Sequence, residues 1–303
     1  MAWDATTWGA CTPEPERTDD RTLDGGGSRS ARPRISHIRQ AARDGVLPGR
    51  SLEKMHTTRI VLLAIGLIYS VPLPAEDDNP IRLRWMPGAG GEFAAPEGWQ
   101  PLTFRNISRH TRYTIQREDG RYVVMAQADA SASGLIHRLQ LRAQEYRLLR
   151  WRWKAENLIG KSDVAHKRGD DYPARIYVAF AYDPKHATFV QRMQYEVIRL
   201  LYGEYPPQAA LNYIWAARAP VGTVVPNAYT SRAAMIVVES GSAHLGQWQE
   251  YERDIYEDYR KAFSGEPPPI SGIAIMTDAD DTGESAVAYY GEISLHRYAE
   301  RQD

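Results

Sequence analysis

The sequence predicts a mainly β fold, a β-sandwich of the jelly-roll type with two inserted helices. Most of the chain beyond residue 100 divides into short segments in which apolar and polar residues alternate, as in strands with one buried face. Turn residues separate these segments, and only two longer segments have helical spacing. Many strands with few helices indicate two packed sheets. A mixed α+β fold is the alternative.

The expected strands follow one another at short intervals. Asp119-Gly120 is the clearest hairpin signal, because both residue types accept the backbone conformation of a tight turn. In segment 146–154, Leu149, Trp151 and Trp153 alternate with arginines, which predicts one buried face and one wet or functional face. The complete set of expected strands is Leu102–Ile107, Arg112–Glu118, Tyr122–Ala128, Gly134–Leu141, Tyr146–Lys154, Arg175–Tyr182, Leu211–Ala217, Ala234–Glu239, Ile270–Thr277 and Ala286–His296.

Two segments predict helices. Val190–Tyr202 has apolar residues at helical spacing and is followed by Gly203 and two prolines, which end helices. His244–Phe263 has one apolar stripe and an opposite face rich in charge, and Gly265 and three prolines close it. We expect this second helix to lie on the body of the domain.

Residues 55–75 predict an export signal that starts at an internal methionine. A short basic head ends at Arg59, the apolar run Ile60–Val71 follows, and Ala75 precedes an acidic segment. The run is too short to span a membrane, which takes about 20 apolar residues. An uncleaved anchor and a buried helix are the alternatives. We therefore expect a disordered or mis-annotated extension (1–54), a signal peptide (55–75), a single β-sandwich domain (76–303) and a periplasmic or secreted location.

Composition narrows the classes of function. The sole cysteine, Cys11, precedes the predicted signal, so the exported part would contain neither disulfides nor thiolate ligands. A formal net charge of −1 does not favour nucleic acid as a partner. Eight Trp and eighteen Tyr against five Phe favour apolar faces that also carry polar groups.

Several motifs, in order, resemble one known family. They are Gly169-Asp-Asp-Tyr-Pro-Ala-Arg-Ile-Tyr-Val-Ala-Phe180, Val224-Val-Pro-Asn-Ala-Tyr-Thr-Ser-Arg232, Val237-Val-Glu-Ser-Gly241, Tyr256-Glu-Asp-Tyr-Arg260 and Gly272-Ile-Ala-Ile-Met-Thr-Asp-Ala-Asp-Asp-Thr-Gly-Glu-Ser285. Together they resemble the bacterial domain of unknown function 3047 family, over most of residues 85–296. The resemblance implies an exported protein and supplies no catalytic residues. The closing strand-loop-strand is also similar to the end of galactose-binding-like jelly rolls found in carbohydrate-binding modules.

A first group of candidate ligand-binding residues is Asp170, Asp171 and Arg175. One carboxylate could orient the guanidinium of Arg175 on the sheet surface, where it would bind a carboxylate or a sugar hydroxyl. The alternative is a charged turn held by a buried Asp–Arg pair.

A second group is Trp215, Asn227, Tyr229 and Arg232. Aromatic rings stack on the C–H faces of sugars, while amide, hydroxyl and guanidinium groups bind sugar hydroxyls. The alternative is a capped loop, with Trp215 in the core.

The acidic loop Asp278, Asp280, Asp281 and Glu284 is a candidate calcium site, because Ca²⁺ takes several oxygen ligands and Gly283 permits a turn. The spacing fails the EF-hand pattern, and a polar loop is the alternative. We expect no other cofactor.

Catalysis by carboxylates is also open. Glu239, Asp278 and Asp280 are candidate catalytic residues of a glycoside hydrolase or lyase, and Glu239 is also a candidate ligand-binding residue. The histidines lack the spacing of a metalloprotease, and the sequence lacks a Gly-x-Ser-x-Gly elbow.

These observations lead to three hypotheses about function. The first is binding of a polysaccharide or a small polar ligand of the cell envelope. The second is a carboxylate-based enzyme on the same scaffold, and the third is an envelope protein that binds another protein through an exposed aromatic patch. We expect no nucleic-acid partner and no stable transmembrane span after signal cleavage, and the sequence does not indicate an oligomeric state.

Overall fold

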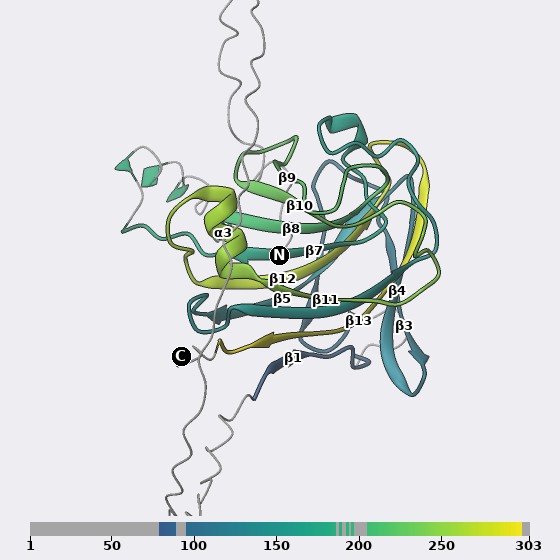
Figure 1. Cartoon of the computed structure of the whole chain (residues 1–303), viewed down its shortest axis with the longest axis horizontal. Helices are drawn as coiled ribbons and strands as arrows, with labels where there is room; N and C mark the ends of the chain where they lie inside the picture. Colours follow the sequence, from purple (N-terminus) through teal and green to yellow (C-terminus); the bar gives the residue numbers. More distant parts are fainter. Residues whose placement is uncertain are drawn as a thin grey trace, which may run out of the picture. The chain divides into compact units, whose positions relative to one another are not determined.

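The computed structural model describes residues 79–88, 95–185, 188–189, 192–193, 195–196 and 205–298. Two β-sheets dominate this part of the chain, so the predicted mainly β sandwich is confirmed (Figure 1). The strands are β1 (Ile81–Leu83), β2 (Trp99–Leu102), β3 (Arg112–Glu118), β4 (Arg121–Asp129), β5 (Ala132–Leu141), β6 (Leu148–Ala155), β7 (Arg175–Phe180), β8 (Ala209–Ala216), β9 (Val224–Pro226), β10 (Ala233–Ser240), β11 (Gln249–Asp254), β12 (Ile270–Asp278) and β13 (Ser285–His296).

The first sheet has the strand order β11-β6-β13-β4-β3, and β1 pairs with the far half of β13. All of its pairs are antiparallel. The hairpin between β3 and β4 turns at Asp119 and Gly120, which have φ values of 50° and 76°. This confirms the hairpin that the sequence predicted at these two residues.

The second sheet has the order β2-β5-β12-β7-β8-β10-β9, and the labels of Figure 1 follow the succession from β5 to β9. Its pairs are antiparallel except for β10 and β8, which run parallel. Because side chains alternate between the faces of a strand, Ile176, Val178 and Phe180 of β7 point into the core, whereas Arg175, Tyr177 and Ala179 point outward.

Aromatic rings from both sheets fill the space between them. Trp151 lies 5.1 Å from Tyr213 between ring centroids, and Trp153 lies 6.4 Å from Trp215. Trp153, Tyr213 and Trp215 are fully buried. This aromatic layer contains three of the eight tryptophans of the chain.

Helix α3 (Ile255–Phe263) is attached to the sandwich by its apolar stripe and by one buried carboxylate. Tyr259 packs against Phe180 of β7 at 4.6 Å between centroids, and Asp258 accepts a hydrogen bond of 2.8 Å from the Tyr213 hydroxyl. The side chain of Asp254 caps the helix, because it accepts from the backbone N–H groups of Tyr256 and Glu257.

Some predicted elements differ from the structure. The helix predicted over 244–263 begins only at Ile255, because Gln249–Asp254 pairs with β6 as strand β11. The strand predicted over 102–107 ends at Leu102, and three short strands (β1, β9 and β11) were not predicted. The predicted helix 190–202 and the predicted signal 55–75 lie wholly or largely outside the described residues.

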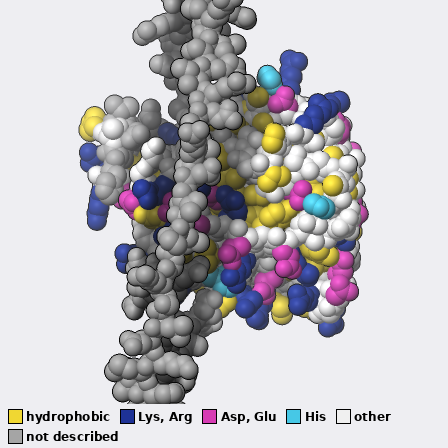
Figure 2. Space-filling view, viewed as in Figure 1, with side chains coloured by type: hydrophobic (Ala, Val, Ile, Leu, Met, Phe, Trp, Pro, Cys, Tyr) yellow, Lys and Arg dark blue, Asp and Glu magenta, His cyan; other side chains and the backbone are white. Residues whose placement is uncertain are grey.

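Within the described residues, no helix is both long and apolar enough to cross a bilayer. On the face seen in Figure 2, basic and acidic side chains are interspersed, and hydrophobic and uncharged atoms lie between them. That mixture agrees with the formal net charge of −1.

Candidate functional site

A cavity of about 340 Å³ opens on the outer face of the second sheet. Strands β2, β5, β7, β10 and β12 contribute its walls, together with the loops that follow β2, β9 and β12. The described residues that line it are Leu102, Phe104, Asn106, Ile107, Ile136, Asp170, Arg175, Tyr177, Ala179, Asn227, Tyr229, Thr230, Ala233, Ala274, Met276, Asp278, Asp280 and Asp281.

The cavity exists because outward positions on three strands carry small side chains. The short side chains of Ala179 of β7, Ala233 of β10 and Ala274 of β12 leave space above the sheet. The larger side chains of Phe104 and Tyr229 also line this space. Ala274 belongs to an outer apolar cluster with Leu102 and Ile136, against which Phe104 and Tyr177 pack. One part of the cavity is therefore apolar, and charged groups gather at the other.

Arg175 is the buried cation of the charged end, with 2% of its surface exposed. Its Nη2 donates to Asp278 Oδ2 at 2.6 Å and to the backbone carbonyl of Asp170, and its Nη1 donates to the Tyr177 hydroxyl at 3.0 Å. Its planar group also lies over the ring of Tyr172, 4.4 Å from the centroid. Burial and this set of partners fix the guanidinium at the base of the cavity.

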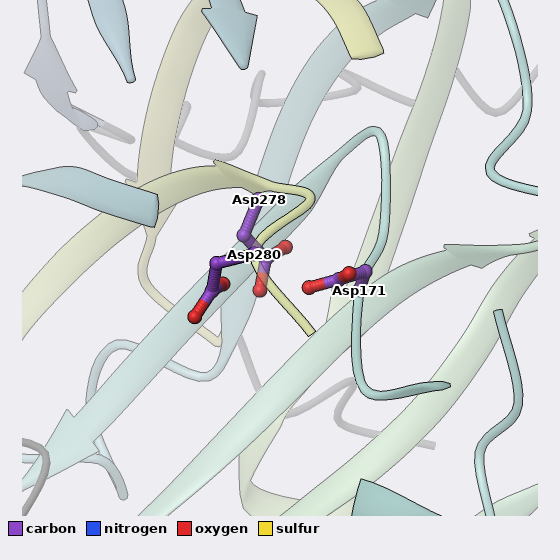
Figure 3. Close-up of side chains that lie close together, drawn as sticks. All are labelled: Asp171, Asp278 and Asp280. Carbon is purple, nitrogen blue, oxygen red and sulfur yellow. The ribbon is translucent and has the colours of Figure 1, made fainter. Parts of the chain in front are cut away.

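Two buried carboxylates tie together the loops that carry the site (Figure 3). Asp171, which precedes β7, accepts from the backbone N–H of Thr282 at 2.6 Å. Asp278, at the end of β12, accepts in return from the backbone N–H of Tyr172 at 3.1 Å. Gly169 precedes this pair at a crowded point, where a Cβ would lie 2.7 Å from the backbone nitrogen of Asp163. The loop conformation therefore depends on glycine there.

The acidic groups outnumber Arg175, and burial raises the pKa values of the four that line the cavity, Asp170, Asp278, Asp280 and Asp281. Burial raises the pKa of Asp278 well above its usual range, and Asp171, Asp170 and Asp280 add to the effect while Arg175 opposes it. Burial, then the neighbouring charges of Asp171 and Asp281, raises the pKa of Asp280 to about 6. The charged end of the cavity is therefore rich in acceptors and holds protons more readily than ordinary aspartates do.

The loop after β9 also lines the cavity, and it is bonded to the acidic groups. Asn227 donates from Nδ2 to Asp170 Oδ2 at 2.8 Å, and its Oδ1 accepts from the backbone N–H of Tyr229 at 2.9 Å. The Tyr229 hydroxyl donates to Asp281 Oδ1 at 2.6 Å, although 44% of the residue is exposed. Tyr229 therefore offers an accessible ring beside fixed polar groups.

The structure brings together most, but not all, of the residues that the sequence singled out. Asp170, Arg175, Asn227, Tyr229, Asp278, Asp280 and Asp281 line the cavity, and Asp171 lies beneath them. Trp215, Arg232, Glu239 and Glu284 are not part of its lining. Three loops that are far apart in the sequence thus contribute to one site.

Trp215 and Glu239 lie in other surroundings. Trp215 is fully buried in the core and donates to the carbonyl of Gly241 at 3.0 Å, as in the alternative interpretation of its motif. Glu239 accepts from the Tyr251 hydroxyl at 2.6 Å, and Tyr251 belongs to the first sheet. Although burial desolvates Glu239, the bonds from Tyr251, Ser240 and His244 lower its pKa. Glu239 is thus an ionised carboxylate with structural partners.

Arg232 and Glu284 also have partners elsewhere. Arg232 donates to the Tyr195 hydroxyl at 3.2 Å and lies over its ring. Glu284 accepts from the backbone N–H groups of Gly160 and Lys161 at 2.8 and 3.0 Å. Glu284 therefore anchors a loop next to the cavity.

The four residues predicted to bind calcium do not form one ligand set. The carboxylate oxygens that lie within 4.8 Å of one another belong to Asp171, Asp278 and Asp280, which Figure 3 shows gathered with Asp278 between the other two. Asp171 and Asp278 already accept from backbone N–H groups, and Asp278 is paired with Arg175. A divalent cation would have to compete with these donors and with a guanidinium, so the group fits calcium poorly.

Sequence reasoning missed several residues of the site. Tyr177 lies two residues from both Arg175 and Ala179 in the predicted strand Arg175–Tyr182, and this spacing, which puts the three on one strand face, was the available signal. Asn106, Phe104 and Met276 carried no comparable signal, because only the folded sheet places them beside the acidic loop.

The fold and the site define a β-sandwich protein with a cavity of about 340 Å³ on the outer face of one sheet. The family model described as "Protein of unknown function (DUF3047)" matches residues 97–294, and the chain belongs to this family. This confirms the resemblance found in the sequence motifs. No curated protein matches the sequence.

Several solved structures are similar to this chain at low identity. The family 11 carbohydrate-binding module of the cellulosomal cellulase Lic26A-Cel5E of Clostridium thermocellum is 10% identical, with a TM-score of 0.38, over 75% of this chain and 99% of that chain. The CBM22-1 xylan-binding domain of Paenibacillus barcinonensis Xyn10C is 12% identical, with a TM-score of 0.32, over 74% and 97%. The family GH12 endoglucanase 3 of Trichoderma harzianum is 8% identical, with a TM-score of 0.37, over 73% and 98%.

Proposed function

We propose that the protein binds a glycan or another small polyhydroxylated ligand in the cavity on the second sheet. The carrying observation is the combination, in one cavity of about 340 Å³, of an apolar part, the exposed ring of Tyr229 and a fixed cluster of aspartates with one arginine. Small-molecule sites have volumes of about 300–1,000 Å³ and are mostly apolar with a few fixed polar groups. The apolar part suits the C–H face of a sugar ring.

The charges of the lining narrow the chemistry of this ligand. Asp170, Asp278, Asp280 and Asp281 face one guanidinium, so the polar end offers many acceptors and few donors. A ligand that donates hydrogen bonds, through neutral hydroxyls or an amine, fits these acceptors. An acidic sugar would bring a further negative charge and is disfavoured.

The experiment is a screen of cell-wall and capsular oligosaccharides on a glycan array, followed by titration calorimetry of the sugars that bind. Calorimetry suits this site because no tryptophan belongs to the described lining. We expect neutral or amino sugars to bind and uronic acids to fail. Failure of every sugar to bind the wild-type protein would contradict the proposal.

Two variants and a control locate the binding site. Tyr229→Phe removes a hydroxyl at the cavity and Asp280→Asn removes a carboxylate there, and each should weaken binding roughly tenfold. Tyr122→Phe is the matched control, since Tyr122 is similarly exposed, at 40%, but lies in the first sheet. Equal affinity in all four proteins would place the ligand elsewhere.

Glycoside cleavage is a second candidate function, favoured by Asp280. A carboxyl group with a pKa of about 6 beside other carboxylates is suited to donate a proton to a leaving group. Product release from a bound sugar that Asp280→Asn abolishes, at sugar concentrations that saturate the variant, would establish this function. Binding without any product supports the first proposal alone.

We also propose that the protein acts outside the cytoplasm. The basis is the pattern of residues 55–75, a basic head and a short apolar run before an acidic segment. Fractionation of cells and sequencing of the N-terminus of the native protein test this proposal. A cytosolic product that retains residues 60–71 would contradict it.

A further inference from the structure

A second cavity, of about 400 Å³, opens on the first sheet and is lined mainly by arginines. Arg82 and Arg84 come from β1 and the segment after it, Arg121 from the start of β4, and Arg152 from the middle of β6. Glu292 of β13 is the one carboxylate among its described lining residues. Four guanidinium groups therefore surround a space that contains a single negative charge.

Glu292 leaves much of this positive charge unbalanced. It forms an ion pair with Arg82 and lies 3.9 Å from Arg84 Nε. Among the residues that the structure describes, neither Arg121 nor Arg152 forms an ion pair. Arg121 is exposed, and Arg152 is half-buried.

The acidic residues near Arg152 either bind other side chains or form no ion pair with it. Glu118 accepts from Lys154 Nζ at 3.1 Å and from Trp248 Nε1 at 3.2 Å, and Arg152 only adds to the lowering of its pKa. Glu250 is opposite Arg152 in the β11–β6 register but forms no ion pair with it. A ligand oxyanion would thus meet Arg152 without having to displace a bonded carboxylate.

The backbone of β13 is shaped around Arg152. Tyr290 pairs with Trp153 and Ile293 pairs with Trp151, so Gly291 and Glu292 bulge opposite the single residue Arg152. A Cβ at Gly291 would lie 2.4 Å from Arg152 Cγ and 2.5 Å from its Nε. On its far side, the Arg152 guanidinium lies over the ring of Trp248, 4.4 Å from the centroid. Glycine and the bulge therefore hold this side chain in place across the strand.

The floor of this cavity is rigid as well. Trp85 is 1% exposed, and its Nε1 donates to the carbonyl of Gly291 at 2.6 Å. Its ring stacks on Trp99 at 4.1 Å between centroids. Trp85 thus connects the bulge of β13 to the segment that carries Arg84.

We infer that this cavity binds an oxyanion, a phosphate or sulfate ester group, through Arg121 and Arg152 with Arg82 and Arg84 beside them. The planar fork of a guanidinium matches the paired oxygens of a phosphoryl or sulfuryl group, and an ordered arginine loses less freedom on binding. The site is separate from the acidic cavity on the second sheet, and its lining carries the opposite charge. It stands whether or not the other cavity binds a sugar.

The test is calorimetric titration of the full chain with sodium pyrophosphate at low and at high NaCl concentration. We expect binding that weakens as salt increases, because the partners are charged and accessible to solvent. The double variant Arg121→Gln/Arg152→Gln should bind roughly tenfold more weakly. Arg112→Gln is the matched control, since Arg112 is an exposed arginine of the same sheet outside the cavity.

Gly291→Ala provides a second variant that keeps all four arginines. Its methyl group should displace Arg152 and weaken pyrophosphate binding, while thermal melting shows that the protein remains folded. Asp280→Asn should leave pyrophosphate binding unchanged, which separates this site from the proposed sugar site. Absence of binding by the wild-type protein at low salt, or equal binding by the double variant, overturns the inference.

Two further titrations distinguish the source of the oxyanion. Glucose 6-phosphate presents it on a free sugar, and phosphatidylglycerol vesicles, compared with phosphatidylcholine vesicles, present it as a lipid headgroup. Binding that the double variant loses supports the site in either case and assigns the source. If the wild-type protein and the double variant both bind both vesicle types, the arginine cavity is not the site that contacts the membrane.

Discussion

Asp280 is the carboxylate of the acidic cavity with the fewest partners. Asp171, Asp278 and Asp281 each accept a hydrogen bond from another residue, whereas Asp280, among the residues that the structure describes, accepts only from its own backbone N–H. Burial and the charges of Asp171 and Asp281 raise its pKa to about 6. A carboxylate kept in such a place costs stability, and that cost is expected where the group serves binding or chemistry.

Replacement of Asp280 by asparagine should stabilise the protein at neutral pH. The folded chain retains this proton up to about pH 6, whereas the unfolded chain releases it near 3.8, the ordinary pKa of an aspartate. Between these values the folded state binds more protons, so stability falls as pH rises and stays lower above pH 6. The variant lacks this loss and should gain about 1–2 kcal/mol at pH 7.5, after discounting for partial exposure.

Thermal melting at two pH values measures this effect. The gain corresponds to about 2–6 °C at pH 7.5 and should be mostly lost at pH 4. Glu250→Gln, at an exposed site in β11, is the control and should change neither melting temperature measurably. A destabilised Asp280→Asn protein at pH 7.5 would show that the carboxylate serves the fold.

Helix α3 illustrates how a short element is positioned by its ends. Asp254 caps the helix, and it also accepts from Arg147, with Nη2 at 2.6 Å. The Arg147 guanidinium is covered by the rings of Tyr256 and Tyr298 at 4.5 and 4.0 Å from the centroids. Asp254, the last residue of β11, is thus also the N-cap of the helix. Its side chain connects β11 and α3 to Arg147, the residue that precedes β6.

Asp254→Ala should destabilise the protein by about 1–2 kcal/mol, because it removes both the cap and the partner of a half-buried arginine. Chemical unfolding measures the change. Glu252→Ala is the control, since Glu252 pairs with Arg150 on the exposed face and should cost less than about 1 kcal/mol. Equal losses in the two variants would mean that the cap does not set the stability of α3.

At the scale of the whole molecule, one aromatic layer joins the sheets and so fixes where the cavity strands lie. Trp153 of β6 and Trp215 of β8 meet at 6.4 Å between centroids, and Tyr251 of β11 packs edge-on against Trp153 at 5.6 Å. The inward faces of β7 and β12 pack on this layer, and their outward faces carry Arg175 and Asp278. The core and the site therefore share the same strands on opposite faces.

Trp215→Phe tests this division between core and site. The smaller ring leaves a gap and removes the bond to Gly241, so we expect a loss of about 1–3 kcal/mol in the free energy of unfolding. Affinity for any sugar bound in the cavity should stay within about twofold, since Trp215 faces away from it. A large loss of affinity in a folded Trp215→Phe protein would show that Trp215 contributes to sugar binding.

Most strands of the sandwich could be predicted from the alternation of apolar and polar residues, whereas strand β11 could not. The alternation around Trp151 and Trp153 marks a strand with one buried face wherever it occurs, and Asp119-Gly120 marks a hairpin. Residues 249–254 show the limit of such patterns. They lie within the segment whose apolar stripe and charged opposite face predicted a helix, but pairing with β6 and the stacking of Tyr251 on Trp151 at 5.3 Å make them a strand.

The sequence by itself determined the class of fold, the family motifs and most of the charged residues of the site, because these depend on residues that are close together along the chain. Only the tertiary structure decided that Trp215 and Glu239 lie away from the cavity, and that Arg121 and Arg152 share another. The physical reason is that each cavity forms where strands distant in sequence become neighbours, and strand order and register, which set those neighbours, are not local properties.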